Sequence, residues 1–281
     1  MTKKQKIRTL TIFFVVIIIS IVGIIFTNGL YQKHETIKEV MKDAVLHEES
    51  KINFFGVEAN PSVVSGFVVT CILLLFALIV RIFAFPKFKK VPGKFQLLIE
   101  TWVDTFRKLA EGNSSHLNRF LGAYVFAVGS YIFVGTCFEL FGIQTVTIKG
   151  NSIALPAPQS DINGAISLGV LSYLVILSGG IAKNKLKGVG LTLKEFSLPI
   201  SMSFRLFGAL LSGALVTELV YYYIALSFVL PVIVGLLFTL LHALIQAYVL
   251  CMLTTVFYGE VSEPVKKKKK ENKKKKVKEI N

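Results

Sequence analysis

Cysteine is scarce in this sequence, and its placement argues against two kinds of site. The chain has only three cysteines, Cys71, Cys137 and Cys251. All three lie in apolar stretches, far apart along the chain and without the spacing of metal ligands. Zinc centres and disulfide frameworks both need cysteines in characteristic patterns. We therefore expect these residues to pack as small core side chains, and we predict neither a bound metal nor a cofactor.

The sequence also lacks a polar stretch long enough to form a soluble domain. Hydrophobic residues make up 53% of the chain and charged residues only 17%. The apolar residues fall in blocks of about twenty, the length of helix that crosses a hydrocarbon core. These features predict an all-α integral membrane protein.

The positive charge of the chain does not indicate a nucleic-acid partner. Residues 264–281 contain ten Lys and two Glu, and so supply +8 of the formal net charge of +15. Many other basic residues flank the apolar blocks, as the positive-inside rule expects for cytoplasmic loops. We predict that residues 261–281 form a disordered cytoplasmic tail, held near membrane lipids where these carry anionic headgroups.

The N-terminal sequence leaves two interpretations open. Residues 1–9 are basic and precede the apolar run Leu10–Phe26, a combination found both in signal peptides and in first membrane spans. No small-x-small cleavage site follows the run, which favours a retained span with a cytoplasmic N-terminus. Residues 1–61 then comprise this span and an outside loop.

Five further apolar stretches bring the predicted number of transmembrane helices to six, with both termini cytoplasmic. They cover approximately residues 62–85, 120–143, 161–182, 196–223 and 231–258. The last two are the longest. Together they place a helical membrane domain at residues 62–260.

One segment between the second and third predicted spans is amphipathic. From Lys94 to Glu111, apolar residues recur at three- and four-residue steps, with charged residues between them. This pattern is typical of a helix that lies on the cytoplasmic membrane surface, and equally of a docking helix for a partner.

The fifth span carries a cation in an unfavourable place. Arg205 lies nine residues after Phe196, and at ~1.5 Å per residue that depth is roughly 14 Å, close to the middle of the membrane. Its guanidinium keeps its proton, and burying it there costs from about 3 to more than 10 kcal/mol. On a helix it shares a face with Ser201, Gly208, Ala209 and Ser212, small residues that allow another helix to approach. This arrangement favours a partner protein of opposite charge over an ion pair within the chain. The aliphatic part of the arginine side chain is too short for the guanidinium to reach the headgroups from this depth.

Other polar residues in the predicted spans gather on both sides of Arg205. In span six, Gln246 falls at a similar depth, which makes it a candidate hydrogen-bond partner for the guanidinium. The remaining candidates suggest two polar half-paths that meet at a fixed cation. On the outer side these are Glu139, Asp161, Asn163, Glu218, Thr239 and His242, and on the inner side Glu195 and Ser201. The alternatives are ordinary interfacial carboxylates and a packed histidine bonded to a neighbour.

These residues carry a resemblance to subunit a of the F-type ATP synthase membrane sector. The family pattern Pro-Leu-Ser-x-Ser-x-Arg-Leu-Phe-Gly-Asn stands here as PISMSFRLFGA at residues 199–209, and Leu-x-Gln-Ala-(Phe/Tyr)-(Val/Ile) as LIQAYV at residues 244–249. The Asp-Ile-Asn at residues 161–163 and the acid Glu139 are weaker matches. Together they cover about residues 95–258 in the family's order.

The resemblance implies a non-catalytic stator subunit in a bacterial cell membrane, working only within a whole F-type ATP synthase. Its implied partners are a rotor ring of small proteolipid subunits and a membrane subunit of the peripheral stalk. Arg205 is implied to be the essential stator cation and Gln246 to position it. Proton transport through the two half-channels then drives rotation and ATP synthesis.

The sequence departs from the family at several positions near the outer path. Ala209 replaces the family's Asn, Ala214 stands where many members have an acid, and Thr239 where a His or Glu is usual. Glu218 and His242 lie one turn beyond the last two positions, so we hypothesise that the outer path has moved by a turn. Two other function classes stay open, a self-contained secondary transporter and a membrane insertase with a polar groove. No internal repeat of the kind typical of secondary transporters is seen.

Overall fold

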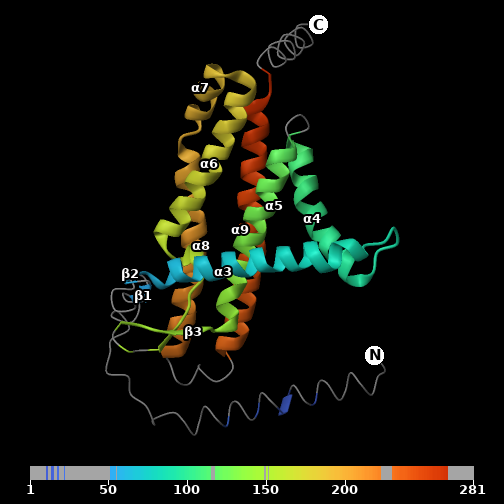
Figure 1. The fold of residues 1–281 in the computed structure, drawn as a ribbon. Coiled ribbons are helices and arrows are strands. Elements are labelled where there is room, and N and C mark those ends of the chain that lie inside the picture. Colours follow the sequence, from blue (N-terminus) through green and yellow to red (C-terminus); the bar gives the residue numbers. More distant parts are fainter. Residues whose placement is uncertain are drawn as a thin grey trace.

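The computed structural model describes residues 51–54, 56–114, 118–148, 150, 152–222 and 230–264, together with positions 11, 14, 15, 18 and 22. Most of the predicted first span, the outside loop before residue 51 and most of the Lys-rich tail lie outside the described residues. The order of the elements is given in Figure 1. The helices are α3 (Pro61–Ile79), α4 (Lys94–Asn113), α5 (Asn118–Phe138), α6 (Ile162–Asn184), α7 (Leu186–Lys194), α8 (Ser197–Tyr222) and α9 (Leu230–Ser262). Short turns η1 (Val80–Ala84) and η2 (Phe85–Lys87) extend α3, η3 (Glu139–Phe141) extends α5, and η4 (Pro158–Ser160) precedes α6.

Five helical segments of the described chain are long and apolar enough to cross a membrane. They are Pro61–Lys87, Arg119–Phe141, Ile162–Asn184, Ser197–Thr217 and Gly235–Ser262. These match the second to sixth spans predicted from the sequence and confirm the all-α membrane fold class. The amphipathic helix predicted from Lys94 is also present, as α4.

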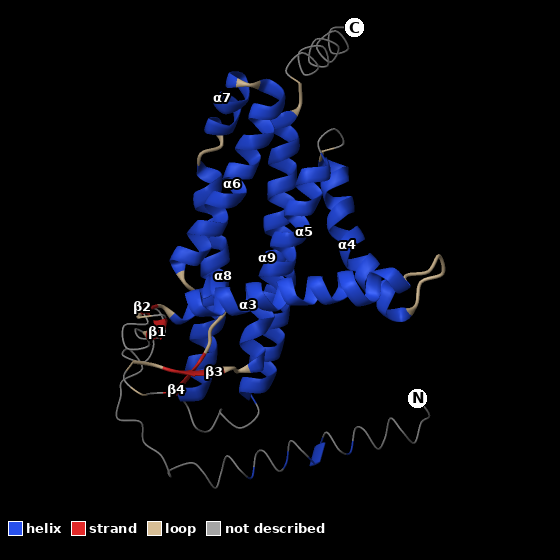
Figure 2. Cartoon of the chain, viewed as in Figure 1, coloured by secondary structure: helices blue, strands red, loops and turns tan. Residues whose placement is uncertain are grey.

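Four antiparallel helices, α5, α6, α8 and α9, pack into a bundle, and α4 lies against α5 and α9 (Figure 2). One apolar cluster joins these helices, with Leu121 and Ile132 from α5, Ile176 from α6, Leu206 from α8 and Leu250 from α9 among its buried members. Lipid tails are as apolar as these side chains, so close van der Waals packing, and not the removal of apolar surface from water, holds the helices together. The bundle is the frame that positions α8 and its arginine.

The helix α3 runs across the long axes of the bundle helices instead of along them (Figure 1). Its apolar side chains are exposed over most of its second half, including Leu74 at 65% and Leu75 at 59%. Such a helix suits contact with lipid along its length. Because α3 and the bundle run in different directions, they cannot all lie along the membrane normal. The distance of roughly 14 Å counted from Phe196 is therefore the greatest depth that Arg205 can have relative to Phe196.

Three features of the fold were not predicted. Two short hairpins, β1 (Ile52–Phe54) with β2 (Val57–Ala59) and β3 (Gln144–Val146) with β4 (Ser152–Ala154), occupy the predicted outside loops. A helix, α7, fills the predicted inside loop after span four. Each of these is short, and neither a three-residue strand nor a nine-residue helix gives a strong periodic signal.

The helix α9 also continues to Ser262, two residues into the segment predicted to be a disordered tail. Val261 and Ser262 are buried. The side-chain amide of Asn184, the last residue of α6, donates to the carbonyl oxygens of Val261 at 2.8 Å and Glu263 at 2.9 Å. These bonds satisfy carbonyls that a helix end leaves free, so the ordered helix runs two residues past the predicted start of the tail at residue 261.

Candidate functional site

The helix α8 has a packed face and an exposed face, and Arg205 lies on the exposed one. Leu198, Met202, Leu206 and Leu210 recur every four residues and are all buried. Arg205 is exposed in this chain, and so are Ser201, Gly208 and Ser212 on the same face. The stripe of small residues around the cation is thus open to a partner or to lipid.

The position of α8 depends on close contact with α6 at Gly169. A Cβ atom added to Gly169 would overlap Ser203 Oγ and lie 2.9 Å from the carbonyl oxygen of Pro199. Ser203 Oγ itself donates to that carbonyl at 2.6 Å. The two backbones therefore approach as closely as only glycine allows, two residues before Arg205 in the chain.

Within the described residues, the Arg205 side chain forms no hydrogen bond or ion pair. The salt bridges described join Lys51 to Glu58, and Arg107 to Asp104 and Glu111, all far from α8 in the sequence. A cation in a membrane helix normally finds a partner, because an unpaired charge in hydrocarbon is costly. Among the described residues, none supplies a counter-charge to Arg205.

The neighbouring helix α9 presents a smooth apolar face. Leu237, Leu241, Leu244 and Tyr248 are each more than half exposed and follow helical spacing. Because α8 and α9 pack together, the cation lies on a hairpin of two helices with much exposed apolar surface.

Gln246 lies on the packed face of α9, at 5% exposure and between the buried Ala243 and Leu250. Its amide forms no hydrogen bond with Arg205 or with any other residue that the structure describes. Its predicted role as a positioning partner stays a prediction.

His242 is half-buried and forms two contacts with Phe238, one helical turn earlier. Its Nδ1 lies 2.7 Å from the Phe238 carbonyl oxygen, and the two rings stack with centroids 5.6 Å apart. A carbonyl oxygen only accepts, so Nδ1 carries the hydrogen. This matches the alternative of a histidine bonded to a neighbour, and it also leaves Nε2 available to a proton or a water. Thr239, three residues earlier, is half-buried as well.

The outer-path candidates come from several elements at the end of the bundle that carries the β-hairpins. Glu139 begins η3 at the end of α5 and is half-buried. Asp161 is buried and caps α6, with its Oδ1 accepting from the backbone N–H of Asn163 at 2.8 Å. The Asn163 side chain is exposed. The backbone of Glu218 lies near the end of α8, and its side chain is outside the described part.

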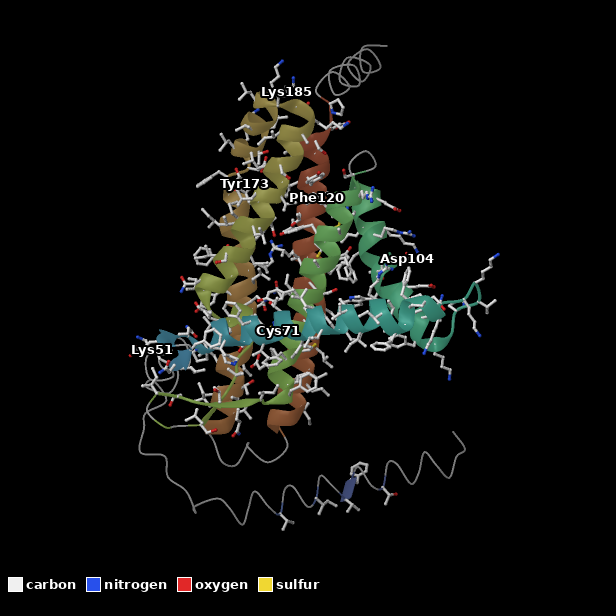
Figure 3. The ribbon with its side chains drawn as sticks, in the orientation of Figure 1. Lys51, Cys71, Asp104, Phe120, Tyr173 and Lys185 are labelled. Atoms are coloured by element: carbon white, nitrogen blue, oxygen red, sulfur yellow. The ribbon has the colours of Figure 1, made fainter. Side chains whose placement is uncertain are left out.

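The inner-path candidates lie at the opposite end, where α7 leads into α8. Glu195 is half-buried between these helices, and Ser201 is exposed in the first turns of α8. Lys185 marks this end at the turn from α6 to α7 (Figure 3). The structure thus separates the two groups of candidates and does not bring them into one cluster.

Sequence reasoning missed three polar residues around η4, namely Ser62, Tyr131 and Gln159. Ser62 and Tyr131, together with the predicted Asp161, line a pocket of about 300 Å³ between parts of α3, α5, η4 and α6. Gln159 lies in η4 and is 1% exposed. In the sequence it stands between two predicted spans like an ordinary loop residue, and no local signal indicates its burial.

Comparison with known proteins identifies the family of this arrangement. Residues 63–259 match the family described as ATP synthase A chain. The chain is similar to ATP synthase subunit a of Histophilus somni strain 129Pt, with 26% identity over 203 residues, 59% of this chain and 76% of that protein. Its similarity to subunit a of strain 2336 is 25% over the same length and coverage. The family match covers the bundle, its arginine and its glutamine, and the chain belongs to the ATP synthase A chain family.

Proposed function

We propose that this chain, a proton-conducting stator subunit of an F-type ATP synthase, carries protons through two half-channels to and from the carboxylates of a rotor ring. The single observation that carries this proposal is the geometry of Arg205. The cation is held on the exposed face of a packed helix, among small residues and without a partner among the described residues. Such a surface fits helices that move past it and each bring one acid.

A guanidinium suits this task because it stays charged throughout the cycle. When a protonated carboxyl arrives within about 4–6 Å, the positive charge lowers its pKa by roughly 1–3 units and favours release of the proton. The fixed charge also opposes direct passage of a proton between the two half-channels. Each proton that crosses a potential of 100 mV releases about 2.3 kcal/mol, which the ring converts into rotation.

We place one half-channel at each end of the bundle. We assign Glu139, Glu218 and His242 to the outer half-channel, with Asp161, Asn163 and Thr239 beside them. Glu195 and Ser201 belong to the inner one. In this assignment Gln246 supports Arg205 from the packed face of α9 once the ring is present. Both termini are then cytoplasmic, and the membrane is the bacterial cell membrane.

The helix α4 fits contact with a membrane subunit of the peripheral stalk. Its inner face packs on α5 and α9, while Phe95, Leu97 and Leu98 are more than half exposed. The same side chains also suit insertion among lipid headgroups. A stalk subunit and the membrane surface would thus contact the same apolar face of α4.

Purification of the intact protein from its own membranes tests the proposed function. We expect a ring of small proteolipid subunits to co-isolate with the chain in mild detergent. Proton or solute transport by the chain alone in liposomes would instead support a secondary transporter. A chain that binds nascent membrane proteins but no ring would support the insertase.

Replacement of Glu218 by Gln tests the outer half-channel. We expect ATP-driven proton pumping in membrane vesicles to fall several-fold, because the amide keeps the shape of the side chain and cannot exchange a proton. The matched control is Glu58→Gln, which removes an exposed carboxylate from β2, in a hairpin at the same end of the bundle, and is expected to leave pumping unchanged. Unchanged pumping in Glu218→Gln would remove the assignment of the outer path to this residue.

A further inference from the structure

Gln159 is a buried amide with no hydrogen-bond partner among the residues that the structure describes. Its side chain is 1% exposed, and neither Oε1 nor Nε2 has a partner. An unsatisfied buried polar group costs about 1–3 kcal/mol, and this amide contributes one acceptor and one donor group. A leucine would fit a dry apolar site better. The placement of a glutamine here therefore points to a polar occupant of the bundle interior.

Four elements surround this amide. The turn η4, which carries Gln159, packs against α3, α5, α6 and α8. On the α5 side, a Cβ atom at Gly135 would lie 3.5 Å from Gln159 Oε1. The amide is thus directed at the interior of the bundle, toward the C-terminal part of α5.

A second unpartnered polar atom follows Gly135 immediately. Thr136 is 0% exposed, and its Oγ1 has no hydrogen-bond partner among the described residues. A threonine in a helix can bond to its own backbone, as Thr105 and Thr254 do here, but Thr136 does not. Glu139 follows three residues later at the end of the same helix. Thr136 and Glu139 therefore lie on successive turns at the end of α5, and Gln159 of η4 lies beside the first of these turns, at Gly135.

The pocket described above lies on the other side of Pro158, the residue before Gln159. The Pro158 ring stands 3.4 Å from a Cβ atom at Gly135 and 3.8 Å from one at Gly66 in α3. The pocket is lined by Ser62, Gly66, Tyr131, Pro158 and Asp161, among others. The lining is mostly apolar and includes a few polar side chains that can bind water. One proline ring thus separates this pocket from the buried amide.

We propose that Gln159 is a positioning residue of the outer half-channel, which holds water molecules that connect this pocket to Glu139. The proposal rests on the proposed function and extends it to a route past α3 and η4. The amide both donates and accepts, so it can orient a water in either direction. It neither gains nor loses a proton at neutral pH, so protons pass along the water without being trapped on the side chain. Thr136 Oγ1 supplies a further hydrogen bond to the same water.

Thiol labelling tests whether the site is wet. We use the intact complex in sealed membrane vesicles, with the three native cysteines replaced by Ser, and a small water-soluble methanethiosulfonate added on the outer side. We expect Gln159→Cys to be labelled several-fold faster than Ile132→Cys, because a thiol reacts as the thiolate, which forms in water. Ile132 is the matched control, since it lies one turn before Thr136 in α5 and is 1% exposed in the apolar cluster. Equal labelling at the two positions would overturn the proposal.

Proton transport supplies the second measurement. We expect Gln159→Leu to lower ATP-driven proton pumping several-fold, and Gln159→Asn, which keeps the amide, to restore part of it. The outer pH that gives half the maximal rate of ATP synthesis should be lower for Gln159→Leu than for the parent. A higher proton concentration outside then compensates for slower entry of protons into the half-channel. A variant that pumps normally and is more heat-stable in detergent would mean a dry site, and so would contradict the proposal.

The test separates this inference from the proposed function. Arg205→Ala is measured in the same vesicles. If Arg205→Ala abolishes pumping while Gln159→Leu pumps normally and Gln159→Cys is not labelled, the inference about Gln159 fails alone. If Arg205→Ala pumps normally, the proposed function itself fails. If Gln159→Leu does not assemble, the labelling of Gln159→Cys decides.

Discussion

ATP-driven proton pumping is expected to disappear when Arg205 is replaced by Ala. The cation lowers the pKa of an arriving carboxyl by roughly 1–3 units, and this effect is lost in the variant. At a pH below the pKa, the fraction of carboxyls that release their proton then falls about 10- to 1,000-fold. The exposed position of Arg205 means that the variant loses no internal salt bridge within the described residues. The complex should therefore assemble, and the loss should be measured as pumping in vesicles that still hydrolyse ATP.

The matched control for this change removes a cation outside the exposed stripe. Lys187→Ala deletes an exposed charge in α7 and is expected to pump as the parent does. Arg205→Lys should also be impaired, because an ammonium lacks the planar fork and can lose its proton in an apolar site. Coupled pumping that survives in Arg205→Ala would remove the basis of the proposed mechanism.

A second large effect is expected at Gly169, which never touches the transported ion. In Gly169→Val the added atoms would overlap Ser203 Oγ and press against the Pro199 carbonyl. The helices α6 and α8 must then separate, at a cost of about 1–3 kcal/mol for an overpacked core. A shift of about 1 Å at a reacting centre can lower a rate by about 100-fold. We therefore expect both reduced heat stability of the detergent-solubilised complex and a strong loss of pumping.

The control for the glycine is Gly190 in α7, where an added Cβ would meet no atom within 4 Å. Gly190→Val places the same side chain at an open position of α7 and should change pumping little. Normal pumping in Gly169→Val would mean that the α6–α8 contact does not set the position of Arg205.

The helices of the bundle were predictable because each leaves a strong signal in the sequence. The apolar lengths from α5 to α9 and the basic residues that flank them mark where the helices start and stop. The exposed stripe around Arg205 was predictable too, since small residues at helical spacing beside an unpaired cation indicate a contact face. In both cases the information is local in the chain.

Features that depend on how helices meet were not predictable in the same way. Hydropathy does not report direction, so the course of α3 across the bundle was missed. The cap that the Asp161 carboxylate forms on α6 was not predicted either, although Asp before a helix often has this role; its place on the proton path stays a prediction. Gln159 was overlooked because a glutamine between two spans reads as a loop residue, and only the packing of four elements buries it.

Cysteine cross-linking tests the central claim most directly, because it asks which face of α8 meets the ring. A cysteine is introduced at Gly208, on the exposed stripe, or at Leu206, which is 1% exposed on the packed face. Each is paired with a cysteine beside the membrane carboxylate of the ring subunit, in a background without the native cysteines. We predict rapid oxidation to a disulfide for Gly208→Cys and none for Leu206→Cys. A cross-link from Leu206→Cys alone, or from neither position in an assembled complex, would contradict the account.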